Sequence, residues 1–493
     1  FSLVPQPAGA GGLWYKGEGG LYEMRLLGPG AALKTGWALV GLLVAGGCKE
    51  PTAEERAITV VITVDTLSQA MANQVGLCAE LQALVGDYGL DLACMEGAVA
   101  PSSWTGESHT RFLFPQNTIG KKRRLPEPPC GQESVLGSIR QGNGGYYIFG
   151  TDNLVLGDSS KEPCGWGRTA FTQGADKVWE TSLGPEEMAP LPEEERPVDQ
   201  ALSSYETQVS KPHGLQMFLN FLEPGGHEPR CWSTPTSAAC EELWQLVVSG
   251  GLVEADADRV ATWLDGEFYG KFMRYFGVTK AEQESRWRPL FWSMIEDGVQ
   301  SQKGARLLDR LRRLLDATRE AGRLGDLRLV IVGDHGENPC VLRGLGDDGL
   351  NCGHLGLPSE YTAFVPVYTS PAALGLRWVE AEIAGEGGKV WALSNMGHGL
   401  VAEVGLPIPE DWPAMEPVGT ATSWICEGPE GSGQSGVHIE GEQAARCRHG
   451  TCDAATFRLP TDGTSTSETL TEVPENLAPW VAEPDWFTTA CKQ

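Results

Sequence analysis

Short apolar runs rich in β-branched residues recur along the chain and predict buried strands. The clearest is Ile58-Thr-Val-Val-Ile-Thr-Val64, which ends at Asp65. A run without strict polar alternation is typical of a strand covered on both faces, as in a parallel sheet. Similar runs occupy residues 146–149, 217–222 and 327–332. The pattern therefore predicts several strands of one buried sheet.

Between the last two of these runs, apolar residues recur with the spacing of an amphipathic helix. Charged residues fill the other face, which we interpret as a solvated surface. These apolar positions are Leu307, Leu308, Leu311, Leu314 and Leu315. Strands that alternate with amphipathic helices indicate an α/β fold, in which helices sandwich a mainly parallel central sheet.

Two acidic residues lie at the ends of predicted strands. Asp65 directly follows the first strand, and Asp334 lies two positions after the strand at 327–332. Ligands of α/β proteins gather outside the carboxyl ends of parallel strands, so both carboxylates are candidates for binding. The alternative for Asp65 is that it only caps the helix after its strand, a common role for aspartate.

The composition is that of a globular protein with a strong negative charge. Of the 493 residues 41% are hydrophobic and 21% are charged, and the formal net charge is −27. Enough apolar side chains are present for a sizeable core, which excludes a disordered chain. A protein that binds the phosphate backbone needs an excess of cations, so nucleic acid is not expected as a partner.

The segment before residue 49 has the features of a secretory signal. Because the first methionine is Met24, we expect residues 1–23 to be an upstream segment. Arg25 and Lys34 precede the apolar stretch 37–45, and small residues lead from it to Cys48. This stretch is short for a helix that spans a membrane. An uncleaved membrane anchor or a buried apolar helix is the alternative.

The same segment resembles a bacterial lipoprotein signal. The resemblance implies that Cys48 is lipidated and becomes the first residue of the mature chain, although Ala45 stands where leucine is usual. It further implies an exported protein that is attached to the membrane by its lipid anchor and faces the periplasm or the cell surface.

The cysteines suit disulfide bonds in an oxidising compartment. The chain has 13 cysteines, so an even number remains once Cys48 is set aside. No set shows the CxxC…CxxC spacing of a structural zinc site. The connectivity stays open, and the local candidates are Cys231 with Cys240, Cys340 with Cys352, and Cys447 with Cys452.

Four segments carry residue types suited to metal binding and ester chemistry. In chain order they are 64–66 with Asp65, 103–109 with Thr105, 222–227 with Glu223 and His227, and 334–337 followed by Gly353-His354. Their order and spacing resemble the sulfatase-like branch of the alkaline phosphatase superfamily over about residues 57–410. Connecting pieces at 145–153, 174–176, Pro366 and 405–407 add to the resemblance.

The resemblance implies two divalent metal ions, zinc first, with manganese or calcium as alternatives. Carboxylates and imidazoles suit such ions, and a pair of them clamps the attacking and leaving oxygens of a transferred phosphoryl or sulfuryl group. Glu223 replaces the aspartate more typical of two-zinc members. By the resemblance the first ion is held by Asp65, Asp334, His335 and the Thr105 oxygen, and the second by Glu223, His227 and His354.

Thr105 is the nucleophile that the resemblance implies. A threonine hydroxyl attacks only when a metal or a base activates it. Standard sulfatases need Cys or Ser here for conversion to formylglycine, whereas threonine is the pattern of phosphodiesterase and phosphotransferase members, so a phosphate ester is favoured over a sulfate ester. An ordinary loop threonine is the alternative. Arg111 is a candidate for binding the substrate's charged oxygens.

Three further histidines are interpreted as hydrogen-bonded or surface residues and are left out of the site: His109, His213 and His398. The domain organisation has four parts: the upstream segment and signal (1–47), a polar tether (48–56), the sulfatase-like catalytic domain (57–419), and a small C-terminal region (420–493). Gly, Ser, Thr and Glu dominate this last region, which we expect to be irregular and held by Cys426, Cys447, Cys452 and Cys491.

The sequence therefore predicts an exported, metal-dependent hydrolase that acts on a small-molecule or envelope ester. Two alternatives stay open. One is a transferase that passes the phosphoryl group to an envelope lipid or glycan. The other is a catalytically inactive, metal-binding surface lipoprotein in which the fold serves recognition.

Overall fold

The chain divides into two units, Phe1–Thr52 and Ala53–Gln493, in this computed structural model. The structure describes residues 13–17, 20–24, 56–114, 134–153, 156, 171–181, 191–221, 304–336, 360–370, 390–410, 412, 414–425, 435–448, 451–459 and 468–482. In the first unit, β1 (Leu13–Gly17) pairs antiparallel with β2 (Gly20–Met24).

The expected signal and lipidation site are not tested by the structure. Residues 25–47 and Cys48 lie outside the described part of the chain. In the part that is described, no helix is both long enough and apolar enough to cross a membrane.

A mixed eight-stranded sheet forms the centre of the second unit, with the order β10-β4-β9-β8-β3-β7-β5-β6. Strands β8, β3, β7, β5 and β6 pair parallel to one another, and β9 runs antiparallel to both β8 and β4. The strands are β3 (Ile58–Val64), β4 (Ala93–Val99), β5 (Tyr146–Thr151), β6 (Lys177–Trp179), β7 (Leu215–Phe221), β8 (Leu327–Gly333), β9 (Phe364–Thr369) and β10 (Trp391–Ala392).

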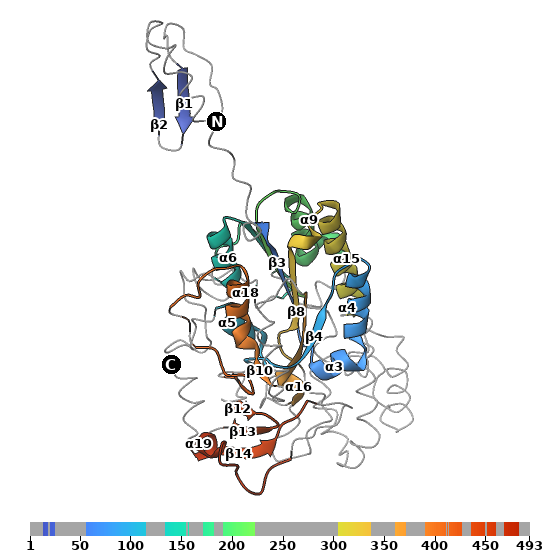
Figure 1. Ribbon diagram of the computed structural model, residues 1–493, viewed down its shortest axis with the longest axis vertical. Helices are drawn as coiled ribbons and strands as arrows, with labels where there is room; N and C mark the ends of the chain where they lie inside the picture. The colour runs from blue at the N-terminus through green and yellow to red at the C-terminus, as the bar shows by residue number, and fades with distance from the viewer. Residues whose placement is uncertain are drawn as a thin grey trace, which may run out of the picture. The chain divides into compact units, whose positions relative to one another are not determined.

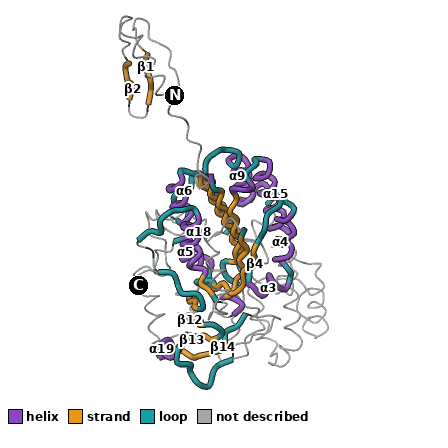
Figure 2. The backbone as a smooth tube through the Cα atoms, viewed as in Figure 1, coloured by secondary structure: helices purple, strands orange, loops and turns teal. Residues whose placement is uncertain are grey.

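Helices cover both faces of this sheet, as the two sides of Figures 1 and 2 show. On one face lie α3 (Gln69–Gln74), α4 (Leu77–Gly86), α9 (Pro197–Gln208) and α15 (Ala305–Glu320). On the other lie α5 (Thr105–Leu113), α6 (Val135–Asn143) and α18 (Met396–Glu403). Shorter helices are α16 (Glu360–Ala363), α19 (Ala478–Ala482), η1 (Glu193–Glu195), η4 (Leu324–Asp326) and η6 (Leu393–Asn395).

Strand β3 shows why its sequence forms a central strand. All seven of its residues are buried. Ile58, Val60, Ile62 and Val64 face the core of one layer, whereas Val61 faces the core of the other. The apolar runs at the other predicted positions become β5, β7 and β8, and the predicted leucine period becomes α15. The α/β fold with helices on both sides of a mainly parallel sheet is thus confirmed.

The C-terminal region is small, and it contains more regular structure than its polar composition indicates. Four strands form an antiparallel sheet in the order β11-β12-β13-β14. They are β11 (Thr420–Ile425), β12 (Ser435–Glu440), β13 (Gln443–Arg448) and β14 (Thr451–Thr456). An apolar cluster that includes Val99, Phe364, Ala421 and Val437 joins this sheet to the edge of the large one.

Two disulfides occur among the described residues. Cys447–Cys452 links β13 to β14, as the sequence predicts, and Cys78–Cys94 links α4 to β4 and was not among the candidates. The other candidate pairs, together with Cys426 and Cys491, lie outside the described residues.

Candidate metal and catalytic site

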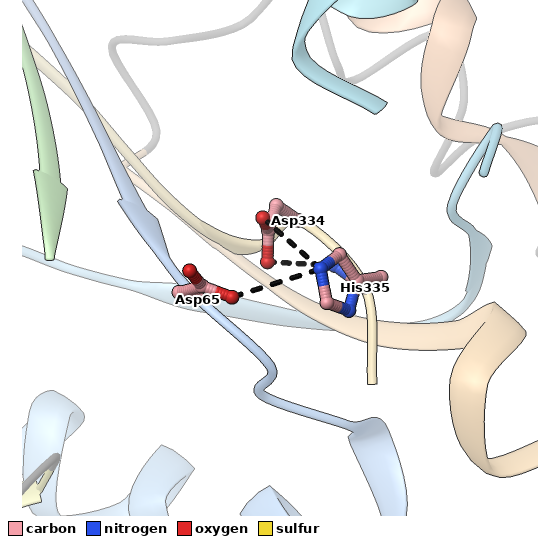
Figure 3. Close-up of side chains that lie close together, drawn as sticks. All are labelled: Asp65, Asp334 and His335. Carbon is pink, nitrogen blue, oxygen red and sulfur yellow. Dashed lines mark hydrogen bonds and ion pairs between the residues drawn. The ribbon is translucent and has the colours of Figure 1, made fainter. Parts of the chain in front are cut away.

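The carboxyl ends of β3 and β8 bring Asp65, Asp334 and His335 together. The two strands are parallel neighbours in register, Val64 opposite Gly333, so the residues that follow them share one edge of the sheet. His335 Nε2 lies 3.6 Å from Asp65 Oδ1 and 3.6 Å from Asp334 Oδ2 (Figure 3). All three side chains are buried. The three side chains thus lie close together in the structure, and their role as metal ligands stays a prediction.

The backbone after β3 fixes the orientation of the carboxylates. Thr66 adopts a left-handed conformation with φ 56°. This turn aims its N–H at Asp334 Oδ1, at 3.1 Å, and the His335 N–H donates to the same oxygen at 2.8 Å. One carboxylate oxygen of Asp334 is therefore held by two backbone donors.

Gly333 allows the two strand ends to approach each other. A Cβ atom at this position would clash with the backbone carbonyl oxygen of Leu67, in the loop that follows β3. Only glycine fits this close approach without a shift of the backbone. The residue before Asp334 is therefore set by packing rather than by chemistry.

Thr105 is the first residue of α5, and its hydroxyl lies within the same cluster. Its Oγ1 is 3.0 Å from His335 Nε2 and 3.4 Å from Asp65 Oδ1. Helix α5 has nine residues, and the side chain of its N-cap residue, Trp104, makes no capping hydrogen bond. The N-terminal end of a helix favours negative charge, so the setting suits an oxygen that becomes anionic.

The tautomer of His335 follows from its other ring nitrogen. Nδ1 lies 3.0 Å from the backbone oxygen of Gly336. A carbonyl only accepts hydrogen bonds, so Nδ1 carries the proton and Nε2 presents its lone pair to Thr105 and the two carboxylates. Nε2 is thus the atom of His335 available to a metal ion.

Two residues that the sequence analysis did not assign to the site also contact the cluster. Asn153, which follows β5, donates from Nδ2 to Asp65 Oδ2 at 2.6 Å. Ser108 on α5 donates from Oγ to the backbone oxygen of Asp334 at 2.6 Å. Two features of the sequence point to Asn153. It comes shortly after a predicted strand of the same sheet, and it ends the segment 145–153 that adds to the resemblance to the family.

His109 lies one turn after Thr105 and is fully buried. Its Nδ1 is 2.8 Å from the Thr105 carbonyl oxygen, and its Nε2 is 3.0 Å from Thr63 Oγ1. Burial lowers the pKa of His109 to about 4, more than the hydrogen bond to Thr105 raises it, so the ring is neutral at pH 7. The interpretation of His109 as a hydrogen-bonded histidine is correct, and its partners place it directly beneath the site.

Arg111 is surrounded by protein groups. Its guanidinium lies 4.1 Å from the centre of the Trp424 ring in β11 and forms a 3.4 Å ion pair with Glu107. It also donates to the backbone oxygens of Pro101 and Trp424. Burial lowers the pKa of Arg111 to about 10, within the range where the group stays charged at pH 7. These contacts connect α5 to the C-terminal sheet, and binding of substrate by Arg111 stays a prediction.

The residues expected to hold a second metal ion are Glu223, His227 and His354. All three lie outside the described residues. Their convergence with the first cluster stays a prediction.

The donor set at the strand ends fits one divalent cation. Within the described ranges, Asp65, Asp334 and His335 offer one ligand atom each, and these atoms all lie within 4.8 Å of one another. Two carboxylates beside a neutral imidazole carry a net negative charge in a buried setting, which a cation compensates. Oxygen and nitrogen donors of this kind suit zinc and manganese.

Comparison with known proteins supports the fold. No protein-family model matches the chain, and a search of curated proteins finds no match either. Among solved structures, Ps i-CgsB is similar with a TM-score of 0.50 and 12% identity, over 89% of this chain and 94% of that one. A candidate sulfatase from Bacteroides thetaiotaomicron is similar with a TM-score of 0.50 and 12% identity, over 88% and 93%.

A weaker similarity, with a TM-score of 0.47, exists to the phosphonate monoester hydrolase of Agrobacterium radiobacter. The identity is 12%, and the match covers 88% of this chain and 94% of that one. At such identities the similarities concern the course of the backbone, and the chemistry has to be argued from the side chains of this chain.

Proposed function

We propose that this chain, which has the sulfatase-like fold of the alkaline phosphatase superfamily, is an exported, metal-dependent hydrolase that cleaves a phosphate ester through Thr105. The observation that carries the proposal is the position of Thr105 Oγ1, 3.0 Å from His335 Nε2 and 3.4 Å from Asp65 Oδ1. A threonine that served only for packing would not require two carboxylates and an imidazole around its hydroxyl.

The cation site supports the same chemistry. Asp65, Asp334 and His335 would hold the first divalent ion, zinc, manganese or calcium, and a second ion would take Glu223, His227 and His354. When bound, such an ion supplies positive charge beside the reacting oxygens and lowers the pKa of a coordinated hydroxyl.

The chain's own residues supply the remaining requirements. Asp65 Oδ1 lies 3.4 Å from Thr105 Oγ1 and can accept the hydroxyl proton as the oxygen attacks, whereas the lone pair of His335 Nε2 would be taken up by the ion. Asn153 holds the far oxygen of Asp65 and so keeps Oδ1 of that residue toward Thr105. The N-terminal end of α5 favours negative charge on the group that Thr105 attacks.

A phosphate ester is preferred to a sulfate ester because of the residue type. Threonine carries a methyl group on Cβ, so it cannot be converted to the formylglycine aldehyde that sulfatases of this fold use. Attack of the Thr105 oxygen on phosphorus breaks the bond from phosphorus to the ester oxygen, so the alcohol leaves and a phosphothreonine forms. Water then cleaves the phosphothreonine to phosphate and free Thr105. We propose a small-molecule or envelope ester as the substrate and a lipid anchor at Cys48 as the membrane attachment.

The test is turnover of an aryl phosphate, an aryl phosphodiester and an aryl sulfate by the purified chain. It is done before and after chelation, with zinc, manganese and calcium added back separately. We expect turnover of a phosphate substrate that chelation abolishes and a metal restores. Turnover of the sulfate alone would contradict the assignment, and turnover of none would favour the metal-binding surface protein. An added alcohol that receives the phosphoryl group in place of water would identify a transferase.

A further inference from the structure

A closed circuit of buried hydrogen bonds runs beneath the nucleophile and returns to it. It passes from Thr105 through His109, Thr63 on β3, Asn220 on β7 and Thr151 on β5 to Asn153 and Asp65. The circuit closes at Asp65 Oδ1, which lies 3.4 Å from Thr105 Oγ1. Every side chain of the circuit is at most 4% exposed.

From the Asn153 N–H to the Thr105 carbonyl oxygen the hydrogen bonds of the circuit all point in one direction, whereas Asp65 only accepts. The Asn153 N–H donates to Thr151 Oγ1 at 3.0 Å, and Thr151 donates to Asn220 Oδ1 at 3.1 Å. Asn220 Nδ2 donates to Thr63 Oγ1 at 2.8 Å and also lies 3.4 Å from His109 Nε2. Of the two acceptors near the Thr63 hydroxyl, His109 Nε2 at 3.0 Å is closer than the Leu219 carbonyl oxygen at 3.4 Å.

The last bond of the series selects the tautomer of His109. The Thr105 carbonyl oxygen only accepts, so His109 Nδ1 carries the proton across 2.8 Å. Its Nε2 is then the acceptor that the Thr63 hydroxyl needs. Each group of the circuit therefore has the role that its neighbours require, and such fully satisfied networks make a core rigid.

The burial of these polar side chains is not explained by packing alone. Thr63 and Asn220 lie next to the ends of β3 and β7, two buried strands whose other residues are apolar except for Thr59 and Gln216. A buried polar side chain costs free energy unless it is hydrogen-bonded, and replacing both hydrogen-bonded partners by apolar groups of the same shape can be nearly neutral. Apolar residues at these positions would fill the same space without any need for such bonds.

We propose that Asn220 and His109 are positioning residues: through Thr63 they hold the first turn of α5 so that Thr105 Oγ1 stays against Asp65 and His335. The proposal rests on the proposed function for its catalytic consequence, and it makes a separate structural claim about the His109 ring. Small displacements of a reacting atom reduce the rate steeply, about 100-fold for 1 Å.

Asn220→Leu tests the catalytic consequence, because leucine has a similar size and no hydrogen-bonding group. We expect kcat to fall by about 10-fold to 100-fold, while KM and the metal content stay near those of the unmodified chain. The matched control is Gln216→Met. Gln216 lies four positions earlier on the same strand face, it is fully buried, and its side-chain atoms have no hydrogen-bond partner within the described residues. An equal fall of kcat in both variants overturns the proposal.

A second pair of variants covers the case in which Asn220→Leu does not fold. Thr63→Val removes the hydroxyl between Asn220 and His109 and keeps the β-branched shape, and Thr63→Ser restores the hydroxyl. We expect a reduced kcat in the valine variant and recovery in the serine variant. A valine variant with unchanged kcat overturns the proposal.

Nitrogen-15 NMR of the histidine-labelled full chain tests the structural claim without turnover, with His109→Gln to assign the ring. We expect the proton on Nδ1 and a changed ring signal in Asn220→Leu but not in Gln216→Met. A proton on Nε2, or a ring signal unchanged in Asn220→Leu, overturns the proposal. If the ring behaves as expected and no ester is turned over, the proposed function fails and the positioning of Thr105 stands.

Discussion

The backbone N–H of Thr66 donates a 3.1 Å hydrogen bond to Asp334 Oδ1, across 268 positions of sequence. Thr66 has a positive φ of 56°, where a β-branched residue is a steric outlier. Its hydroxyl donates to the Asp65 carbonyl oxygen at 2.8 Å, so two bonds hold the strained turn in place. The strained turn at Thr66 therefore also orients the carboxylate of Asp334. Backbone strain of this kind is common at functional sites.

Thr66→Val should destabilise the fold by about 1 to 2 kcal/mol. Valine keeps the shape and the N–H but loses the hydroxyl, so the buried Asp65 carbonyl loses a donor in an already strained turn. Equilibrium unfolding in urea measures the change. Thr66→Ser retains the hydroxyl and is the control, with a smaller loss expected. Equal stability of the valine and serine variants would show that the hydrogen bond does not support the turn.

Thr105→Ala should abolish turnover, with a fall in kcat of about 1000-fold or more, and should leave the fold intact. The hydroxyl is proposed to attack the ester, whereas its methyl group contributes little to the core. Activity assays and thermal unfolding of the same preparation measure both effects. Thr105→Ser keeps a hydroxyl and should retain part of the activity. An alanine variant that still turns over substrate at the normal rate would remove the covalent mechanism.

Asp334→Asn should lower the affinity for the divalent ion by at least about 10-fold, since loss of a direct ligand costs no less than loss of an outer partner. The amide oxygen still accepts the N–H bonds of Thr66 and His335, so the local fold is expected to persist. Elemental analysis and metal titration measure the effect. The control is Asp309→Asn, because Asp309 is 75% exposed on α15. Unchanged metal content in Asp334→Asn would count against this residue as a ligand.

The parts of the fold that could be predicted are those in which local pattern and tertiary environment agree. Strands β3 and β8 are continuous apolar runs because both of their faces are covered, and Asp65 and Asp334 follow from where the runs stop. Strand β4 was not predicted, since Cys94, Glu96 and Gly97 interrupt its apolar residues and its pairing with β9 is irregular. The C-terminal sheet was not predicted because its strands are short and polar in composition. Only β11 alternates, between buried and partly buried positions, whereas β12 is buried along most of its length.

The parts of the site that could not be predicted depend on contacts between distant strands. The sequence places His109 outside the site, because no local pattern on a helix shows that its ring contacts Thr63 of a distant strand. Asn220 lies within the apolar run of β7 and Asn153 lies two positions after β5. Only the register of β7 with β3 and of β5 with β7 shows that these residues meet. The resemblance to a family supplied Thr105, which no periodicity distinguishes from an ordinary loop threonine.

Arg111→Met distinguishes a structural role of Arg111, in which it holds α5 against Trp424, from a role in substrate binding. Loss of the guanidinium leaves Glu107 buried without its ion pair, so we expect the free energy of unfolding to fall by about 3 kcal/mol. If Arg111 only braces α5 against Trp424, KM stays unchanged in the folded variant. A KM raised by 10-fold or so, with kcat less affected, would support the predicted contact with substrate. Unfolding in urea and steady-state kinetics measure the two effects.

Glu416 should make stability depend on pH in the neutral range. Burial raises the pKa of this partly buried carboxyl to about 7, and the hydrogen bonds from Thr422 and Ser394 and the charge of Arg111 oppose the rise. A folded-state pKa above the unfolded value of 4.5 means that the folded chain binds the proton more tightly. This contribution is fully present below about pH 4.5 and is lost as the pH rises through 7.

Glu416→Gln removes the titration, because glutamine stays neutral at every pH and keeps an acceptor for Ser394 Oγ, which lies 3.2 Å from the carboxylate. Relative to the unmodified chain, the variant should gain about 2 kcal/mol of stability between pH 5 and pH 8. Urea unfolding across this range measures the difference, with the exposed Glu410→Gln as the control. Parallel pH profiles for Glu416→Gln and the unmodified chain would show that Glu416 is ionised in the folded state throughout, which would place its pKa near the ordinary value.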